Sequence, residues 1–148
     1  MLSKATIEAK YKRAKLQATH TFLWEDVPLN LKAEIVRRIK ILDGEMIAIY
    51  FYESNKYSWA LTNVRLIVLD AGKETDYFYH LIKKVELRDL MSGDANKLSN
   101  DTITLVLQDN TLRNIKVEST TWHAIYEILQ LLVHTSSSIS GNSSNQNR

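Results

Sequence analysis

Cysteine is absent from this 148-residue chain, proline occurs once and glycine only four times. The lack of cysteine excludes a disulfide framework, thiolate metal sites, iron–sulfur clusters and a cysteine nucleophile. None of the few glycines forms a glycine-rich loop ahead of a helix, so we expect no phosphate-binding loop. No long uncharged apolar run and no signal-peptide pattern is present. We therefore expect a cytoplasmic protein, with a membrane-peripheral location as the alternative.

Apolar residues make up 45% of the chain and charged residues 24%, which is typical of a globular protein with its own core. The charge is unevenly distributed. Residues 1–40 carry nine lysines and arginines against four acids, whereas the remaining residues carry ten against thirteen. The basic excess is concentrated near the start of the chain, at Lys4, Lys10, Lys12, Arg13 and Lys15. These cations form either the solvated face of an amphipathic helix or a surface that attracts nucleic acid or anionic lipid.

The first helix is predicted over residues 3–24. Apolar side chains recur three or four positions apart from Ile7 to Phe22, so they lie on one face of a helix. The hydroxyl of Ser3 is expected to cap the first turn by accepting a hydrogen bond from a backbone N–H. The stretch contains no glycine or proline that would interrupt it.

A second helix is predicted to begin around Pro28, because proline is tolerated in the first turn, where its missing N–H costs nothing. Its apolar stripe includes Ile35 and Ile39, and the pair Asp43-Gly44 is expected to end it. We expect the two helices to form an N-terminal extension over residues 1–41.

Residues 45–117 change to a β-pattern. Alternating or continuous apolar runs separated by polar turns predict about seven short strands. In the last hairpin, a two-residue turn at Asp109-Asn110 would place Leu105 opposite Asn114. A three-residue loop or a bulge that shifts the register by one places Leu105 opposite Ile115 instead, so that apolar residues share one face. We expect this second register, with Ile103 opposite Val117.

A last helix is predicted to begin at Ser119, which caps it. Its apolar stripe is wide enough to bury against a sheet, and it consists of Trp122, Ile125, Ile128, Leu129 and Leu132. Residues 135–148 are rich in serine and asparagine, and we expect them to form a disordered tail. The order of elements predicts an antiparallel sheet curled into a barrel or sandwich, with the last helix over an open end.

Two short motifs carry a family resemblance: the pair Gly44-Glu45, and the hairpin Leu61-Thr62-Asn63-Val64-Arg65-Leu66-Ile67. With the helix near Trp122, these motifs resemble bacterial pleckstrin-homology-like (PH-like) domains, which are relatives of the GRAM domain. The resemblance covers residues 42–134. It implies an α+β fold, namely a PH-like antiparallel β-barrel of about seven strands capped by a C-terminal α-helix, with the two-helix extension outside it. The hairpin motif indicates a turn and not a reactive site, since asparagine tolerates the left-handed backbone of a turn.

No catalytic, cofactor-binding or metal-binding constellation stands out in the sequence. The four histidines lack the spacing of a helical metal site, and the carboxylates at Asp70, Glu74 and Asp76 lack a calcium-loop pattern. We therefore expect no enzyme activity, no cofactor and no metal. Eukaryotic relatives of the family that the chain resembles bind phosphoinositides with several basic residues around the first strand–strand loop. In that loop this chain offers only Lys56, which Glu53 opposes.

The candidate interaction surface combines the basic helix with aromatic residues of the first strands. It consists of Lys10, Lys12, Arg13, Lys15, Lys56, Tyr57, Trp59, Tyr77 and Tyr79. Because neighbours on a strand point to opposite faces, not all the aromatics can enter one core. Those outside it either form a recognition surface or are covered by the N-terminal helices.

The function predicted from these features is that of a non-catalytic protein-interaction module. Its partner is another protein or a second copy of the chain, and an immunity or inhibitor protein is one form that such a module takes. The alternative is peripheral binding to anionic membrane lipid through the basic N-terminal helix. Nucleic-acid binding is not expected, because the sheet lacks basic residues and a glycine–aromatic RNA signature.

Overall fold

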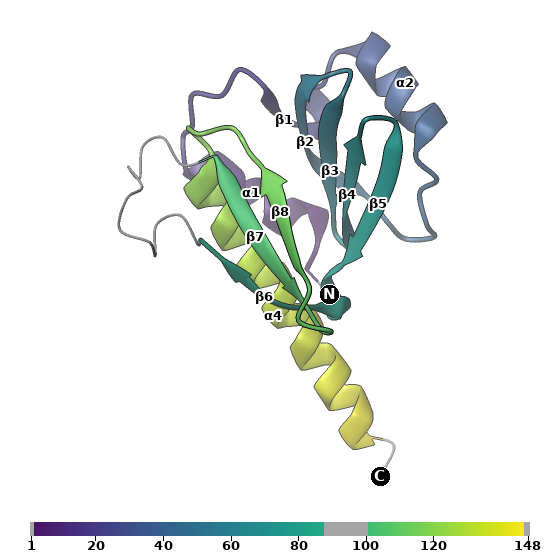
Figure 1. Cartoon of the computed structure of the whole chain (residues 1–148), viewed down its shortest axis with the longest axis vertical. Coiled ribbons are helices and arrows are strands. Elements are labelled where there is room, and N and C mark those ends of the chain that lie inside the picture. The colour runs from purple at the N-terminus through teal and green to yellow at the C-terminus, as the bar shows by residue number, and fades with distance from the viewer. Residues whose placement is uncertain (1, 88–100, 147–148) are drawn as a thin grey trace.

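The computed structural model describes residues 2–87 and 101–146 of the chain. Within these ranges the fold is α+β, with two antiparallel sheets and three α-helices (Figure 1). The first sheet has the order β1 (Thr21–Leu23), β2 (Ile47–Ser54), β3 (Tyr57–Thr62), β4 (Arg65–Asp70) and β5 (Lys73–Phe78). The second sheet has the order β6 (Ile82–Glu86), β7 (Thr102–Leu107) and β8 (Leu112–Lys116).

The strands predicted between Glu45 and Val117 are present as β2–β8, but they form two sheets and not one continuous barrel wall. Among the described residues, no strand ladder joins the two sheets. Side chains of β3 connect them instead. The indole Nε1 of Trp59 donates to the carbonyl of Lys116 at 2.8 Å, and the Tyr57 hydroxyl accepts from the Lys116 backbone N–H at 2.9 Å.

The first helix, α1 (Lys4–Arg13), is shorter than predicted. Ser3 caps it as expected, accepting a hydrogen bond from the Thr6 N–H at 3.2 Å. The prediction that the helix continues to residue 24 is wrong. Lys15 takes a positive φ of 49°, and Thr21–Leu23 forms the edge strand β1 paired with β2. The available edge of β2 favours an extended conformation for this β-branched and aromatic segment over continued helix.

Helix α2 (Leu29–Arg38) follows Pro28, which occupies its N-cap position. Its buried residue Ile35, together with Ile39, packs on the outer face of the first sheet against Tyr50 and Ile67. The inner face belongs to the main core, to which α1 contributes Ile7 and the last helix contributes its apolar stripe. In Figure 1, α2 lies at one end of the molecule, away from the other two helices.

The β7–β8 hairpin has the three-residue loop that was predicted, Gln108–Asn110, with Asn110 at a φ of 67°. The predicted pairs are wrong by two positions, since Ile103 pairs with Ile115 and Leu105 with Arg113. A shift of two keeps each side chain on its face, so Ile103, Leu105 and Ile115 are still buried together.

The last helix, α4 (Trp122–Gln146), begins three residues after Ser119, so Ser119 is not its cap. Thr121 precedes the helix, and its carbonyl accepts the first helical bond from the Ile125 N–H at 3.0 Å. The helix also includes residues 135–146, which were predicted to be a disordered tail. Extending a formed helix requires less ordering than starting one, which allows a serine-rich segment to continue it. In Figure 1 this C-terminal part extends beyond both sheets.

Candidate interaction surfaces

Two residues of the short motifs noted in the sequence, Glu45 and Arg65, form a buried ion pair. Glu45 and Arg65 are 5% and 4% exposed, and the Arg65 Nε and Nη2 atoms lie 2.8 and 3.0 Å from the two Glu45 carboxylate oxygens. A second carboxylate, that of Asp76 on β5, lies 2.9 Å from Nη1 of Arg65. The Thr62 hydroxyl donates to Glu45 at 2.7 Å. All these groups lie on the outer face of the first sheet, beside the residues under α2.

Two further motif residues fix the turn between β3 and β4. Asn63 accepts a hydrogen bond from the Met46 N–H at 2.8 Å and donates one to the Gly44 carbonyl at 3.2 Å. Gly44 has a φ of 77°, a backbone conformation that favours glycine. The motif residues therefore act on one another, and their arrangement accounts for the motif as a structural feature.

Hydrogen bonding controls the ionisation of Glu45. Burial raises the pKa of this carboxyl, but hydrogen bonds from Arg65, the Leu42 N–H and Thr62 outweigh burial, so its pKa lies below the ordinary value of 4.5. Glu45 therefore stays ionised beside Arg65 at neutral pH. Both Glu45 carboxylate oxygens accept hydrogen bonds from within the chain, which is the arrangement that a buried charge requires.

Two of the four aromatic residues of the predicted surface are not exposed. Trp59 and Tyr79 are fully buried in the main core, and this part of the prediction is corrected. Trp59 faces inward from β3, and the Tyr79 hydroxyl lies 2.7 Å from the Thr62 carbonyl. Tyr57 and Tyr77 are half-buried at the edge of the same core, and burial raises the pKa of Tyr57 to about 12.

The outer-face aromatics are covered by α2, as the alternative interpretation held. Tyr50 is buried in the cluster beneath this helix, with Trp24 and Tyr52 packed against that cluster. Lys56 is exposed in the β2–β3 turn, where the nearby Glu53 carboxylate pairs with Lys116 at 2.7 Å. The turn thus presents one cation, which does not provide the converging donors that a multivalent phosphate requires.

Four of the five cations near the start of the chain, all except Lys4, gather at the C-terminal end of α1. Lys10 pairs with Glu127 at 3.7 Å, and Lys12 pairs with Glu25 at 3.6 Å. Arg13 and Lys15 are exposed and have no ion-pair partner within residues 2–87 and 101–146. Cations in a last helical turn also complement the negative end of the helix dipole.

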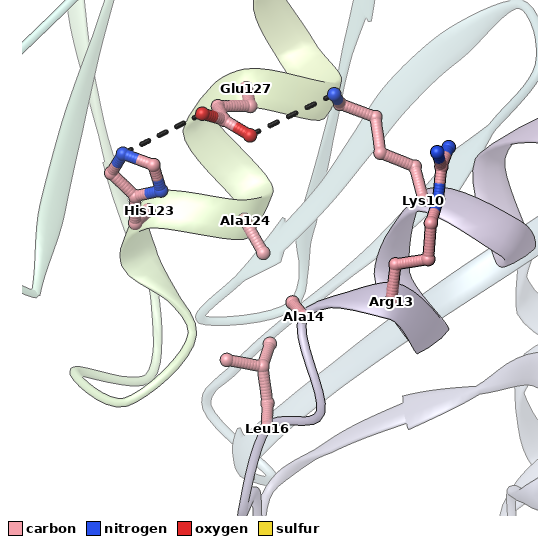
Figure 2. Close-up of a pocket in the computed structure, with 7 residues that line it drawn as sticks. All are labelled: Lys10, Arg13, Ala14, Leu16, His123, Ala124 and Glu127. Carbon is pink, nitrogen blue, oxygen red and sulfur yellow. Dashed lines mark ion pairs between the residues drawn. The ribbon is translucent and has the colours of Figure 1, made fainter.

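A groove of about 450 Å³ separates this end of α1 from α4. Its polar lining consists of Lys10, Arg13, His123 and Glu127, and its apolar lining consists of Ala14, Leu16 and Ala124. Figure 2 shows Lys10 and Arg13 side by side on α1, and His123 and Glu127 on α4 opposite them. The Glu127 carboxylate lies within ion-pair distance of both Lys10 and His123, and its Oε1 is 3.6 Å from the His123 Nε2. The α4 residues of the groove were not predicted, because they are more than a hundred positions from α1 and no local pattern links them to it.

Glu118, which precedes α4, is hydrogen-bonded to the first residue of β1 and to the two residues before it. Its carboxylate accepts hydrogen bonds from the Thr19 N–H at 2.8 Å, the His20 N–H at 3.1 Å and the Thr21 hydroxyl at 2.7 Å. Burial raises the pKa of Glu118, but these hydrogen bonds outweigh burial and hold its pKa below 4.5. The segment that leads from α1 into β1 is thereby tied to the start of α4.

Neither a metal-ion cluster nor a membrane-spanning helix is found in the described part of the chain. No cluster of three or more histidine, aspartate or glutamate side chains suitable for a metal ion occurs there. None of the helices described is both long and apolar enough to span a bilayer.

Comparison with known proteins gives one structural similarity. No family model matches the chain, and no curated protein matches its sequence. The chain is similar to the crystal structure of a PH domain-containing bacterial protein from Exiguobacterium sibiricum 255-15. The match has a TM-score of 0.49 and 18% sequence identity, and it covers 82% of this chain and 71% of that chain.

Proposed function

We propose that this chain is a non-catalytic module that binds an acidic segment of a partner protein in the groove between α1 and α4. One observation chiefly supports the proposal: the groove places the cation Arg13 beside the apolar side chains of Ala14, Leu16 and Ala124. A guanidinium group binds a carboxylate through two parallel hydrogen bonds, which gives recognition a defined geometry. The apolar lining adds contact area that does not depend on direction.

The ion pairs already in the groove support a carboxylate as the ligand group. Glu127 lies between Lys10 and His123, so one carboxylate is already held on the α4 side. Arg13 lies next to Lys10 on the opposite wall and has no such partner in the described residues (Figure 2). An incoming aspartate or glutamate would complete the pairing on that wall.

The test compares two variants that change charge equally. Lys10→Glu/Arg13→Glu alters the groove, and Arg37→Glu/Lys40→Glu alters the end of α2 and the residues just after it by the same four charges. Proteins captured from a cell extract by each immobilised chain are identified by mass spectrometry, and the affinity of the captured partner is then measured in purified form. We expect the groove variant to lose about tenfold or more in affinity, and the α2 variant to retain it.

Two results would contradict the proposal. One is equal binding of the partner by the groove variant and the wild type. The other is self-association as the only interaction, which light scattering at several protein concentrations detects. Weakening of the partner complex by salt is also required, because the groove acts through exposed charges.

A further inference from the structure

Helix α2 carries an exposed apolar stripe on the side that faces away from the sheet. Leu29 is 83% exposed and Val36 is 60% exposed. Their spacing of seven residues places them two turns apart on one flank of the helix, with the exposed Ala33 between them. The buried side chain of Ile35 points to the sheet, so the stripe is separate from the contact that holds α2 in place.

The stripe and the exposed apolar residues that follow it in the chain are together called the α2 apolar patch. It consists of Leu29, Val36, Ile41, Leu42 and Met46. In the described part of the chain, only two other large hydrophobic side chains are comparably exposed, Leu81 and Leu112. Single exposed apolar residues are normal, whereas a concentration of them in one segment indicates a surface that binds a protein or a membrane.

The charges around the patch are mainly positive. Lys32, Arg37, Arg38 and Lys40 lie in this segment, against the exposed carboxylates of Glu34 and Asp43. A second copy of the chain would bring two basic faces together, which disfavours a dimer through this patch. A negatively charged partner is therefore favoured.

The shape of the surface favours a membrane over a protein groove. α2 lies on the outside of the first sheet, and no element of the described chain covers its outer side (Figure 1). Aliphatic side chains on a convex helix, with lysine and arginine beside them, suit the boundary between headgroups and acyl chains. The basic residues there would meet the phosphates of an anionic leaflet.

We propose that the α2 apolar patch rests on an anionic phospholipid membrane, with Leu29 and Val36 entering the interface and Arg37 and Lys40 contacting lipid phosphates. This inference goes beyond the proposed function, because α2 packs on the outer face of the first sheet whereas α1 belongs to the inner core. The groove and the patch therefore lie on different sides of the sheet and can be occupied at the same time.

The absence of cysteine permits a direct test. A Val36→Cys variant of the full chain is labelled with an environment-sensitive fluorophore and mixed with phosphatidylcholine vesicles, with or without phosphatidylserine. We expect a blue shift and increased emission only with phosphatidylserine, which weaken as salt is added. The same label at Ala9→Cys, an exposed position of α1, should not respond.

Co-sedimentation with the phosphatidylserine vesicles then shows which residues contact the lipid. Leu29→Glu/Val36→Glu should lower binding by about tenfold or more, since it removes the two most exposed apolar side chains. The matched control Leu81→Glu/Leu112→Glu removes exposed apolar surface elsewhere and should bind as the wild type does.

Any of three outcomes overturns the proposal. The first is no binding to phosphatidylserine vesicles at low salt. The second is an equal loss in the Leu81/Leu112 control. The third is a dimer, or a complex with an acidic protein, that depends on Leu29 and Val36 while vesicle binding does not. Because the changed residues are exposed, circular dichroism should show all variants folded.

Discussion

The two faces of the β1–β5 sheet differ in how they are covered. The inner face meets α1, α4 and the second sheet in one large apolar cluster that includes Trp59 and Tyr79. The outer face is covered by α2 over part of its area, and the Glu45–Arg65 pair occupies the adjoining part. The inner face therefore supplies most of the apolar packing. On the outer face, α2 is the helix that covers the sheet, and the outward side of α2 leaves apolar side chains exposed.

The largest expected effect is on the inner face. Trp59→Ala should lower the free energy of unfolding by about 3–5 kcal/mol, because it creates a cavity and removes the hydrogen bond to Lys116 that joins the sheets. Urea denaturation followed by circular dichroism measures the loss. If Trp59→Ala lowers the free energy of unfolding by less than a substitution on the outer face does, the inner face is not the better packed of the two.

The ion pair on the outer face should come next. Glu45→Ala leaves the buried Arg65 without its main partner, so we expect a loss of about 3 kcal/mol in the free energy of unfolding. The double variant Glu45→Leu/Arg65→Met should lose less than Glu45→Ala alone, since no unpaired charge remains buried. If the double variant loses the sum of two single effects, the pair is not coupled as described.

The attachment of α2 can be tested within the helix itself. Ile35→Ala should cost about 2 kcal/mol, because Ile35 is 2% exposed and packs on the sheet. Leu29→Ala, in the first turn of the same helix, should change stability by about 0.5 kcal/mol or less. Equal effects of the two substitutions would show that α2 is not oriented as described.

Acid should weaken the tie between the start of β1 and α4. The pKa of Glu118 is lower in the folded chain than its ordinary value of 4.5, so its contribution is complete above pH 4.5 and is lost as pH falls below that value. Glu118→Gln should therefore cost about 1–2 kcal/mol at neutral pH. The difference in the free energy of unfolding between the variant and the wild type should become smaller as the pH is lowered from about 5 to 3. If this difference does not change with pH, the Glu118 carboxylate is not the group that produces it.

The sequence patterns predicted some of these features and missed others for physical reasons. Alternation and turn residues located β2–β8, because local pleating and turn chemistry determine those elements. The strand β1 was missed because its extended form depends on the edge of β2, which is remote in sequence. The groove and the Glu118 tie were missed for the same reason, as each joins residues about a hundred positions apart.

Trp59 and Tyr79 were wrongly predicted to be surface residues, because period-two alternation cannot tell which faces of a sheet will be covered. Trp59 and Tyr50 lie on opposite faces of the sheet, and both are buried, one by the main core and the other by α2. The basic residues Lys10 and Arg13 were located correctly as exposed or half-exposed positions of a helix, because their spacing alone defines a polar face.

One crossed measurement tests most directly whether the two surfaces act separately. The variants Lys10→Glu/Arg13→Glu and Arg37→Glu/Lys40→Glu are each assayed for partner binding and for sedimentation with phosphatidylserine vesicles. We expect the first variant to lose binding to the partner and to retain binding to the vesicles, and the second variant to do the reverse. Loss of both kinds of binding in both variants would contradict two separate surfaces, because the overall positive charge would then explain all the binding.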